Sequence, residues 1–245
     1  MTLHSFALDS LVLDGATAAG YRQRVLTKAI LFDLDGTLLD TIEDIQSAAN
    51  AALEPEGFSP ITYEETRSRV GWGLRRLVEQ SVPPGTPEEV IDRAFGELVR
   101  VYQADPTARS RIYDGIPELL DALTEAGMPM AVLSNKTHSI TELVVAKLFG
   151  RWSFAVVHGA KEGVPPKPDP RSALSISEAL GVPPEQMMFA GDTGVDMQTA
   201  KSAGMFPVGV SWGFRSLDEL RSNGAGATVD DPAELLALIR EEEVV

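Results

Sequence analysis

The chain has 245 residues, which suffices for one sizeable domain or two modest ones. Its formal net charge of −15 argues against a nucleic-acid partner, because a phosphate backbone requires a basic surface. It contains no cysteine, which excludes disulfides, thiolate chemistry and thiolate metal sites. No apolar run approaches the roughly 18 residues that span a bilayer, so we expect no membrane association and a cytoplasmic location.

Residues 1–27 are interpreted as an extension of unknown role. Asp9 and Asp14 interrupt its apolar stretch, which is not typical of a secretory signal. The spaced apolar residues fit a strand or hairpin added to the rest of the fold, and they fit a partly ordered arm equally well: Phe6, Leu8, Leu11 and Leu13.

From Lys28 onward, short apolar runs alternate with helical patterns. The expected strands are Ala29–Asp33, Met130–Ser134, Phe154–Val157, Met187–Gly191 and Pro207–Val210, with a weaker one near Ala227–Val229. Nearly continuous apolar runs are typical of parallel strands that are covered on both faces. The expected helices between them, each followed by a glycine suited to a helix C-cap, are Ile116–Ala126, Ile140–Phe149 and Ser172–Leu180. This alternation predicts an α/β fold with a doubly wound parallel sheet.

One interval breaks the alternation. Roughly a hundred residues separate the first two strands, whereas a crossover needs only about a dozen. Helical patterns fill the gap at Ile42–Leu53, Tyr63–Val70, Leu74–Ser81 and Glu88–Tyr102. We therefore expect an inserted all-helical domain over residues 40–113 and an α/β core formed by residues 28–39 and 114–245. A single, more elaborate domain is the alternative.

Two carboxylates, Asp33 and Asp35, come at the end of the first strand. Residues i and i+2 of an extended chain project to the same side, so these side chains can converge at the carboxyl end of the strand, where open α/β sheets bind ligands. Gly36 then permits a sharp exit. Two like charges this close favour a shared Mg²⁺, which prefers oxygen ligands. A helix N-cap followed by a solvated turn is the alternative.

Polar residues also end the second strand and occupy a proline-rich loop. Ser134 and Asn135, with the N–H groups of a helix expected to begin near Thr137, suit a phosphate oxygen. Lys167 has prolines on both sides, and a rigidly held ammonium group can balance charge at a reacting phosphoryl group. Simple helix capping and a solvated loop lysine are the alternatives.

A further acidic pair, Asp192 and Asp196, follows the strand Met187–Gly191. Asp192 is a candidate second ligand for the same cation, and Asp196 a candidate for holding a water or orienting the loop. An N-cap with an acidic first helical turn is the alternative. Taken together, Asp33, Ser134 and Asp192 each end an expected strand, which places them on one edge of one sheet.

The motifs Asp33-x-Asp35-Gly36-Thr37, Ser134-Asn135, Lys167 and Gly191-Asp192-x-x-x-Asp196, in this order, resemble those of the haloacid dehalogenase superfamily. The resemblance extends from about Lys28 to Leu238 and is strongest to the branch that resembles phosphoglycolate phosphatase. The inserted helices match the mobile cap of that branch.

The resemblance implies a Mg²⁺-dependent phosphatase that acts on a small phosphorylated metabolite. Asp33 would attack phosphorus, and Asp35 would protonate the leaving oxygen and then activate the hydrolytic water. Mg²⁺ would be held by Asp33, Asp192 and the main-chain carbonyl of Asp35. The phosphoryl oxygens would be bound by Ser134 and Lys167, with Thr37 and Asn135 assisting.

The specificity loop of this branch corresponds here to Gly71-Trp72-Gly73, followed by Arg75 and Arg76. Flanking glycines permit a loop to enter a cleft, and an arginine could bind a carboxylate or a second phosphate of the substrate. The alternative is a helix junction with solvated arginines. The branch more often has a small polar residue at the position of Trp72, which leaves phosphoglycolate itself in question.

Three other functions compete with a phosphatase. A sugar-phosphate mutase of the same superfamily would retain the phosphoryl group. A receiver-type signalling module is about half this length and lacks a helical insertion. A silent binding protein has no need of Asp33, Asp35, Lys167 and Asp192 together. Either a monomer or a homodimer is compatible with the sequence.

Overall fold

The computed structural model describes residues 26–241. The strand or hairpin considered for residues 1–24 therefore lies outside the described part of the chain. No helix within residues 26–241 is both long and apolar enough to cross a bilayer.

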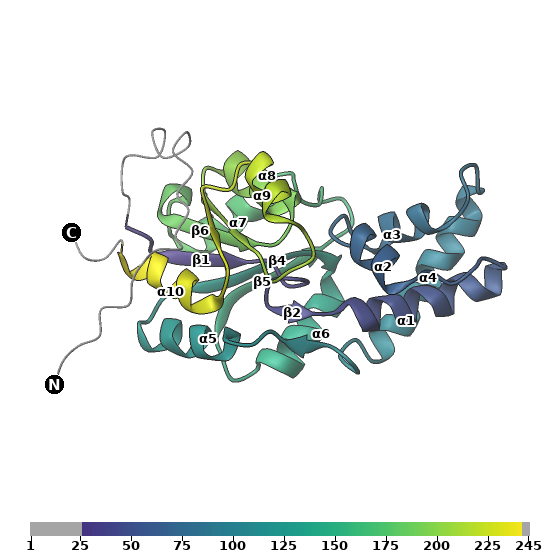
Figure 1. The fold of residues 1–245 in the computed structure, drawn as a ribbon, viewed down its shortest axis with the longest axis horizontal. Coiled ribbons are helices and arrows are strands. Elements are labelled where there is room, and N and C mark those ends of the chain that lie inside the picture. The colour runs from purple at the N-terminus through teal and green to yellow at the C-terminus, as the bar shows by residue number, and fades with distance from the viewer. Residues whose placement is uncertain (1–25, 242–245) are drawn as a thin grey trace.

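A six-stranded sheet forms the centre of the molecule (Figure 1). Its strands are β1 (Ala29–Phe32), β4 (Met130–Thr137), β5 (Phe154–Ala160), β6 (Met187–Gly191), β7 (Phe206–Val210) and β8 (Ala227–Val229). They pair in the order β5-β4-β1-β6-β7-β8, and every pairing is parallel. The predicted doubly wound α/β class is confirmed.

Both faces of β1 are covered, as its continuous apolar sequence predicts. Ile30 and Phe32 belong to one apolar cluster with the helices on one face, whereas Ala29 and Leu31 belong to a second cluster on the other. The first face carries α5 (Ile116–Glu125), α6 (His138–Phe149) and α10 (Pro232–Glu241), and the opposite face carries α7 (Arg171–Leu180), α8 (Gly194–Ala203) and α9 (Leu217–Ser222). Each fully buried large side chain contributes about 1.5–3 kcal/mol to the free energy of folding.

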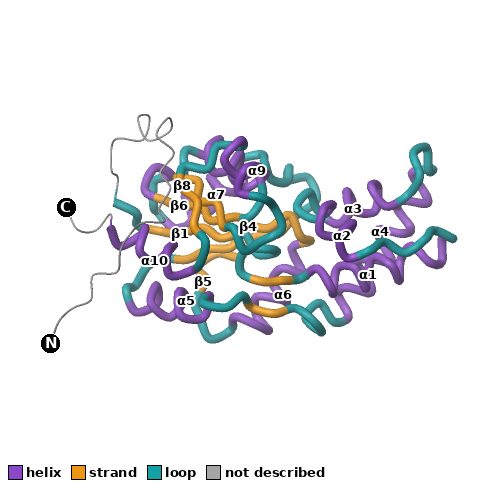
Figure 2. The backbone as a smooth tube through the Cα atoms, viewed as in Figure 1, coloured by secondary structure: helices purple, strands orange, loops and turns teal. Residues whose placement is uncertain are grey.

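Four helices lie beyond one end of the sheet, where Figure 2 shows only helix and loop. They are α1 (Ile42–Leu53), α2 (Tyr63–Arg69), α3 (Leu74–Ser81) and α4 (Glu88–Ala104), and we call them the helical insertion. Two short antiparallel strands, β2 (Leu39–Asp40) and β3 (Arg111–Ile112), carry the chain out and back. Because they contain two residues each, they are too short to show a periodic pattern, and they were not predicted. The domain boundaries at residues 40 and 113 stay predictions.

Several details of the elements differ from the sequence-based expectation. β1 ends at Phe32, one residue before Asp33, because the chain turns there into the Gly36 loop. β4 continues three residues past Ser134, because Thr137 still pairs with Ala160 of β5 across an irregular register. Gly150 follows α6 with right-handed backbone angles (φ −60°), so it is not the left-handed C-cap that we expected.

Candidate active site

The parallel pairing of β1 with β4 and β6 brings three distant parts of the sequence to one edge of the sheet. Asp33 directly follows β1, and its N–H donates to the carbonyl of Ala190 in β6 over 2.9 Å. Ser134 lies in β4, and Asp192 follows β6. All three side chains are buried, with exposed fractions of 5%, 3% and 0%. The predicted edge is therefore where these residues meet.

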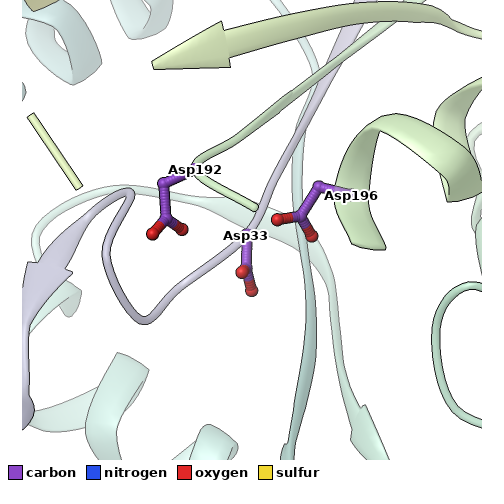
Figure 3. Close-up of side chains that lie close together, drawn as sticks. All are labelled: Asp33, Asp192 and Asp196. Carbon is purple, nitrogen blue, oxygen red and sulfur yellow. The ribbon is translucent and has the colours of Figure 1, made fainter. Parts of the chain in front are cut away.

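Three carboxylates converge at this edge (Figure 3). Asp33, Asp192 and Asp196 each offer an oxygen, and these oxygens lie within 4.8 Å of one another. Burial, followed by the charge of Asp196, raises the pKa of Asp192 to about 7, so negative charge on this carboxylate is costly unless a cation offsets it. Three buried carboxylates that each offer an oxygen donor fit a divalent cation such as Mg²⁺.

Asp196 is itself a member of this cluster, whereas the sequence suggested only a role in holding a water or orienting the loop. Thr193 and Asp196 form a capping box at the start of α8, in which Asp196 Oδ2 accepts the N–H of Thr193 at 3.0 Å and its hydroxyl at 2.6 Å. This bends the carboxylate back toward the helix N-terminus. Its other oxygen, Oδ1, accepts a hydrogen bond from Lys167 Nζ over 2.6 Å.

Lys167 supplies positive charge to the cluster. Its Nζ lies 2.9 Å from Asp33 Oδ1 and 2.6 Å from Asp196 Oδ1. Burial lowers the pKa of this lysine, but the charges of Asp196 and Asp33 outweigh burial and leave the pKa above its usual value. The pKa of Asp33 is raised by burial first and by Asp196 next, and Lys167 opposes both effects.

The side chain of Asn135 fixes the backbone of Lys167. Its Oδ1 accepts the Lys167 N–H at 2.8 Å, and its Nδ2 donates to the carbonyls of Lys167 (3.1 Å) and Gly71 (3.0 Å). The side chain predicted to assist phosphate binding is thus bonded to backbone on both sides of the site. It joins the lysine loop to the helical insertion.

Asp35 and Thr37 have different partners. The Asp35 carboxylate accepts hydrogen bonds from Thr41 Oγ1 (2.7 Å) and from the ammonium group of Lys136. Thr37 Oγ1 donates to Asp192 Oδ1 over 3.2 Å. Asp35 lines the same pocket as Asp33 but is not one of the three clustered carboxylates, whereas Thr37 orients one of those three.

Lys136 was not predicted to belong to the site. It is 3% exposed and lines the same pocket as Asp33 and Asp35. Burial lowers the pKa of Lys136, but the opposing effects of Asp35 and Tyr102 together outweigh burial and leave that pKa above its usual value. The ring of Tyr102, from α4, lies 4.9 Å from its Nζ. A lysine in a polar stretch is usually solvated, so composition alone does not predict its burial.

The predicted specificity residues Trp72, Arg75 and Arg76 are neighbours of residues that line the pocket, but none of the three lines it. Gly71 and Gly73 line the pocket, while the Trp72 side chain is 49% exposed. Arg75 binds Glu79, Glu88 and Asp92, and Arg76 binds Glu79. Arg75 is thus paired with carboxylates of α3 and α4, and Arg76 with a carboxylate of α3. From the insertion, the pocket receives apolar side chains of Ile45, Val70, Leu74 and Leu77.

The segment that follows β7, Trp212-Gly213-Phe214-Arg215, borders the site. Trp212 Nε1 donates to the carbonyl of Thr37 over 3.0 Å, and the N–H of Phe214 donates to Asp192 Oδ2 over 2.8 Å. A Cβ placed on Gly213 would lie 2.2 Å from Asp192 Cβ and 2.4 Å from the carbonyl oxygen of Gly36. Only glycine fits between these two loops.

The fold and the site together define a doubly wound α/β enzyme with an acidic centre suited to a metal. The chain belongs to the haloacid dehalogenase-like hydrolases, whose family model matches residues 30–210. It is 31% identical to a phosphoglycolate phosphatase of Agrobacterium fabrum, covering 90% of this chain and 96% of that relative. It is also 31% identical to an N-acetylmuramic acid 6-phosphate phosphatase of Pseudomonas aeruginosa, covering 89% and 96% of the two chains.

Solved structures agree with the fold. A beta-phosphoglucomutase of Clostridium difficile superposes with a TM-score of 0.71 at 24% identity, covering 89% of this chain and 97% of the other. A structure from Lactobacillus delbrueckii, provisionally named a phosphoglycolate phosphatase, superposes with a TM-score of 0.81 at 30% identity, covering 87% and 98%. The predicted superfamily and the predicted enzyme class, a phosphoric monoester hydrolase, are confirmed.

The packing of Gly213 yields a test of the acidic cluster. We expect Gly213→Ala to push Asp192 out of place and to weaken Mg²⁺ binding about 10- to 100-fold, as loss of a ligand's supporting contacts does elsewhere. Mg²⁺-dependent thermal stabilisation measures this effect. Gly96→Ala is the matched control, because nothing lies within 4 Å of its added Cβ on α4. Equal Mg²⁺ affinity in both variants would contradict the assigned cluster.

Proposed function

We propose that this protein is a Mg²⁺-dependent phosphatase that hydrolyses a small-molecule phosphate monoester through an aspartyl-phosphate on Asp33. One observation carries the proposal: the Asp33 carboxylate lies among Asp192 and Asp196 and in contact with the ammonium group of Lys167. A carboxylate nucleophile, a cation site and a fixed positive charge are the parts that phosphoryl transfer requires.

Mg²⁺ would be held by Asp33 and Asp192 with the main-chain carbonyl of Asp35, and the position of Asp196 makes it a further candidate ligand. When bound, the metal neutralises charge between the nucleophile and the phosphoryl group. Lys167, whose Nζ lies 2.9 Å from Asp33 Oδ1, would add further positive charge there and would bind phosphoryl oxygens together with Ser134. Because the amide of Asn135 is bonded to backbone, we propose that it assists by holding Lys167.

The reaction proceeds in two steps. An Asp33 oxygen bonds to phosphorus as the bond between phosphorus and the leaving-group oxygen breaks. The Asp35 carboxyl group donates a proton to the leaving-group oxygen. Asp35 then takes a proton from the water that attacks the aspartyl-phosphate, which releases inorganic phosphate and restores Asp33. Thr41 and Lys136 hold the Asp35 carboxylate in one orientation for both transfers.

The helical insertion is proposed to act as a cap over this site. Its loop around Gly71 and Gly73 lines the pocket, and its helices supply apolar walls. The names of the relatives point to phosphoglycolate or a sugar phosphate as the class of substrate. A sugar-phosphate mutase is the second candidate, because a beta-phosphoglucomutase shares the fold.

A phosphate-release screen separates these activities. We expect Mg²⁺-dependent release of inorganic phosphate from at least one member of a panel of phosphoglycolate, sugar phosphates and nucleoside monophosphates, with no bisphosphate activator. Isomerisation of a sugar phosphate without net phosphate release would favour the mutase. EDTA should abolish release, and added Mg²⁺ should restore it.

Replacing the proposed nucleophile tests the covalent step. Asp33→Asn keeps the shape of the side chain but removes the attacking charge, so we expect phosphate release to fall by about 10⁴-fold or more with the fold intact. Circular dichroism checks the fold, and mass spectrometry of quenched wild-type enzyme detects the phosphorylated Asp33 peptide. Asp218→Asn, on exposed helix α9, is the control. Retained activity in Asp33→Asn would rule out this nucleophile.

Asp35→Asn tests the acid–base step. The amide can still accept from Thr41 but cannot exchange a proton with the leaving oxygen or the water, so we expect kcat to fall about 10²-fold or more. The loss should be smaller for an ester with a good leaving group, since that group departs without a proton. An equal loss for good and poor leaving groups would argue that Asp35 acts only in the hydrolysis of the intermediate.

A further inference from the structure

Arg215 makes a polar contact between the core and the helical insertion. Its guanidinium donates to three carbonyls at the end of α2: Arg67 at 2.6 Å, Ser68 at 2.9 Å and Val70 at 2.6 Å. Its Nε also lies 3.6 Å from Glu219 of α9. The arginine belongs to the segment after β7, so it reaches from the core into the insertion.

This contact supplies hydrogen-bond donors to the carbonyls at the C-terminal end of α2. The last carbonyls of a helix have no partner within the helix and carry the negative end of the helix dipole. The chain leaves α2 in an extended conformation at Val70. A planar guanidinium presents several donors in a fixed geometry, and charged donors form stronger hydrogen bonds than neutral ones. Arg215 therefore caps α2 from another part of the fold.

Bonds cross the same boundary in the opposite direction. Arg67 Nη2, on α2, donates to the carbonyl of Gly213 over 3.1 Å. A Cβ added to Gly71 would lie 3.4 Å from Thr193 Cγ2, which places the loop after α2 directly against the turn that opens α8. Residues of both sides also line one crevice there, among them Trp72, Gln198 and Asn223.

The core end of this contact is attached to the acidic cluster. The residue before Arg215, Phe214, donates its N–H to Asp192, and Gly213 packs against the Asp192 side chain. The carbonyl that accepts from Arg67 belongs to that same glycine. A displacement of α2 would therefore shift Gly213 and Phe214, the two residues that contact Asp192.

We infer that Arg215 is a positioning residue that couples the seating of the helical insertion on the core to the placement of Asp192. The inference rests on the proposed function, in which Asp192 is a metal ligand. Seating of the insertion orders Gly213 and Phe214, and these order Asp192. The site is then assembled only when the insertion covers it, which limits hydrolysis to enclosed substrate.

Hydrogen exchange followed by mass spectrometry tests the coupling without any turnover. In Arg215→Ala, we expect faster exchange at the C-terminal end of α2 and at the Phe214 amide, with unchanged exchange in β1. A general loss of stability would instead speed exchange throughout the sheet. Arg100→Ala is the matched control, because its partner Glu97 is on the same exposed helix face. Wild-type exchange at Phe214 in Arg215→Ala would overturn the inference.

Kinetics and Mg²⁺ titration give a second measurement. We expect Arg215→Ala to lower kcat/KM about 10- to 100-fold and to raise the Mg²⁺ concentration for half-maximal thermal stabilisation, while Arg100→Ala changes neither. Arg215→Lys should recover little, since an ammonium cannot reach three carbonyls in the geometry of the guanidinium. Full recovery of activity in Arg215→Lys would overturn the proposal that the three bonds from the guanidinium hold the insertion in place.

Arg67→Ala provides an independent variant that keeps the backbone carbonyl bonded to Arg215. It removes the bond to Gly213, so we expect the same pattern of exchange at Phe214 with a smaller change. If the wild-type protein released phosphate from no ester, the proposed function would fail, yet the exchange and Mg²⁺ results would still decide the coupling. A change confined to α2, with Phe214 unaffected in both variants, would reduce Arg215 to a helix cap.

Discussion

The contact between Lys167 and the carboxylates of Asp33 and Asp196 is the interaction on which the rest of the site depends. Buried carboxylates are costly unless they are paired, because they lose the solvation that stabilises their charge. The ammonium group lies within 3 Å of two of them. Without it, the edge of the sheet would hold adjacent buried negative charges, and the pKa of Asp33 would rise further than burial and Asp196 already raise it.

The positions of Asn135 and Asp196 follow from this requirement. A lysine that must stay between two carboxylates needs a fixed backbone, and Asn135 fixes it with one accepted and one donated bond. Asp196 must present one oxygen to Lys167, and the capping box with Thr193 occupies the other. Asn135 Nδ2 also donates to the carbonyl of Gly71, so the same side chain that fixes Lys167 also binds the loop of the helical insertion.

The sequence predicted the parts of the site that follow from strand order. The carboxyl ends of parallel strands share an edge, so Asp33, Ser134 and Asp192 could be placed together from apolar runs alone. The insertion could be predicted because its helices carry clear periodic patterns. The partners of individual charges could not be predicted in this way. Lys136 is buried against Asp35, whereas Arg75 pairs with Glu88 and Asp92, and both outcomes depend on how separate elements pack against one another.

The charge balance of the assembled site explains how an acidic chain can receive an anionic substrate. Four carboxylates face two ammonium groups among the described residues that form this centre: Asp33, Asp35, Asp192 and Asp196 against Lys136 and Lys167. Both lysines are already bonded to carboxylates, so neither alone offsets a phosphate dianion. A divalent cation would bring the centre near neutrality before the substrate adds its own charge, which is why the acidic cluster fits a metal better than a second lysine would. The overall charge of −15 then sets the field around the molecule, while the local balance decides what can bind at the edge of the sheet.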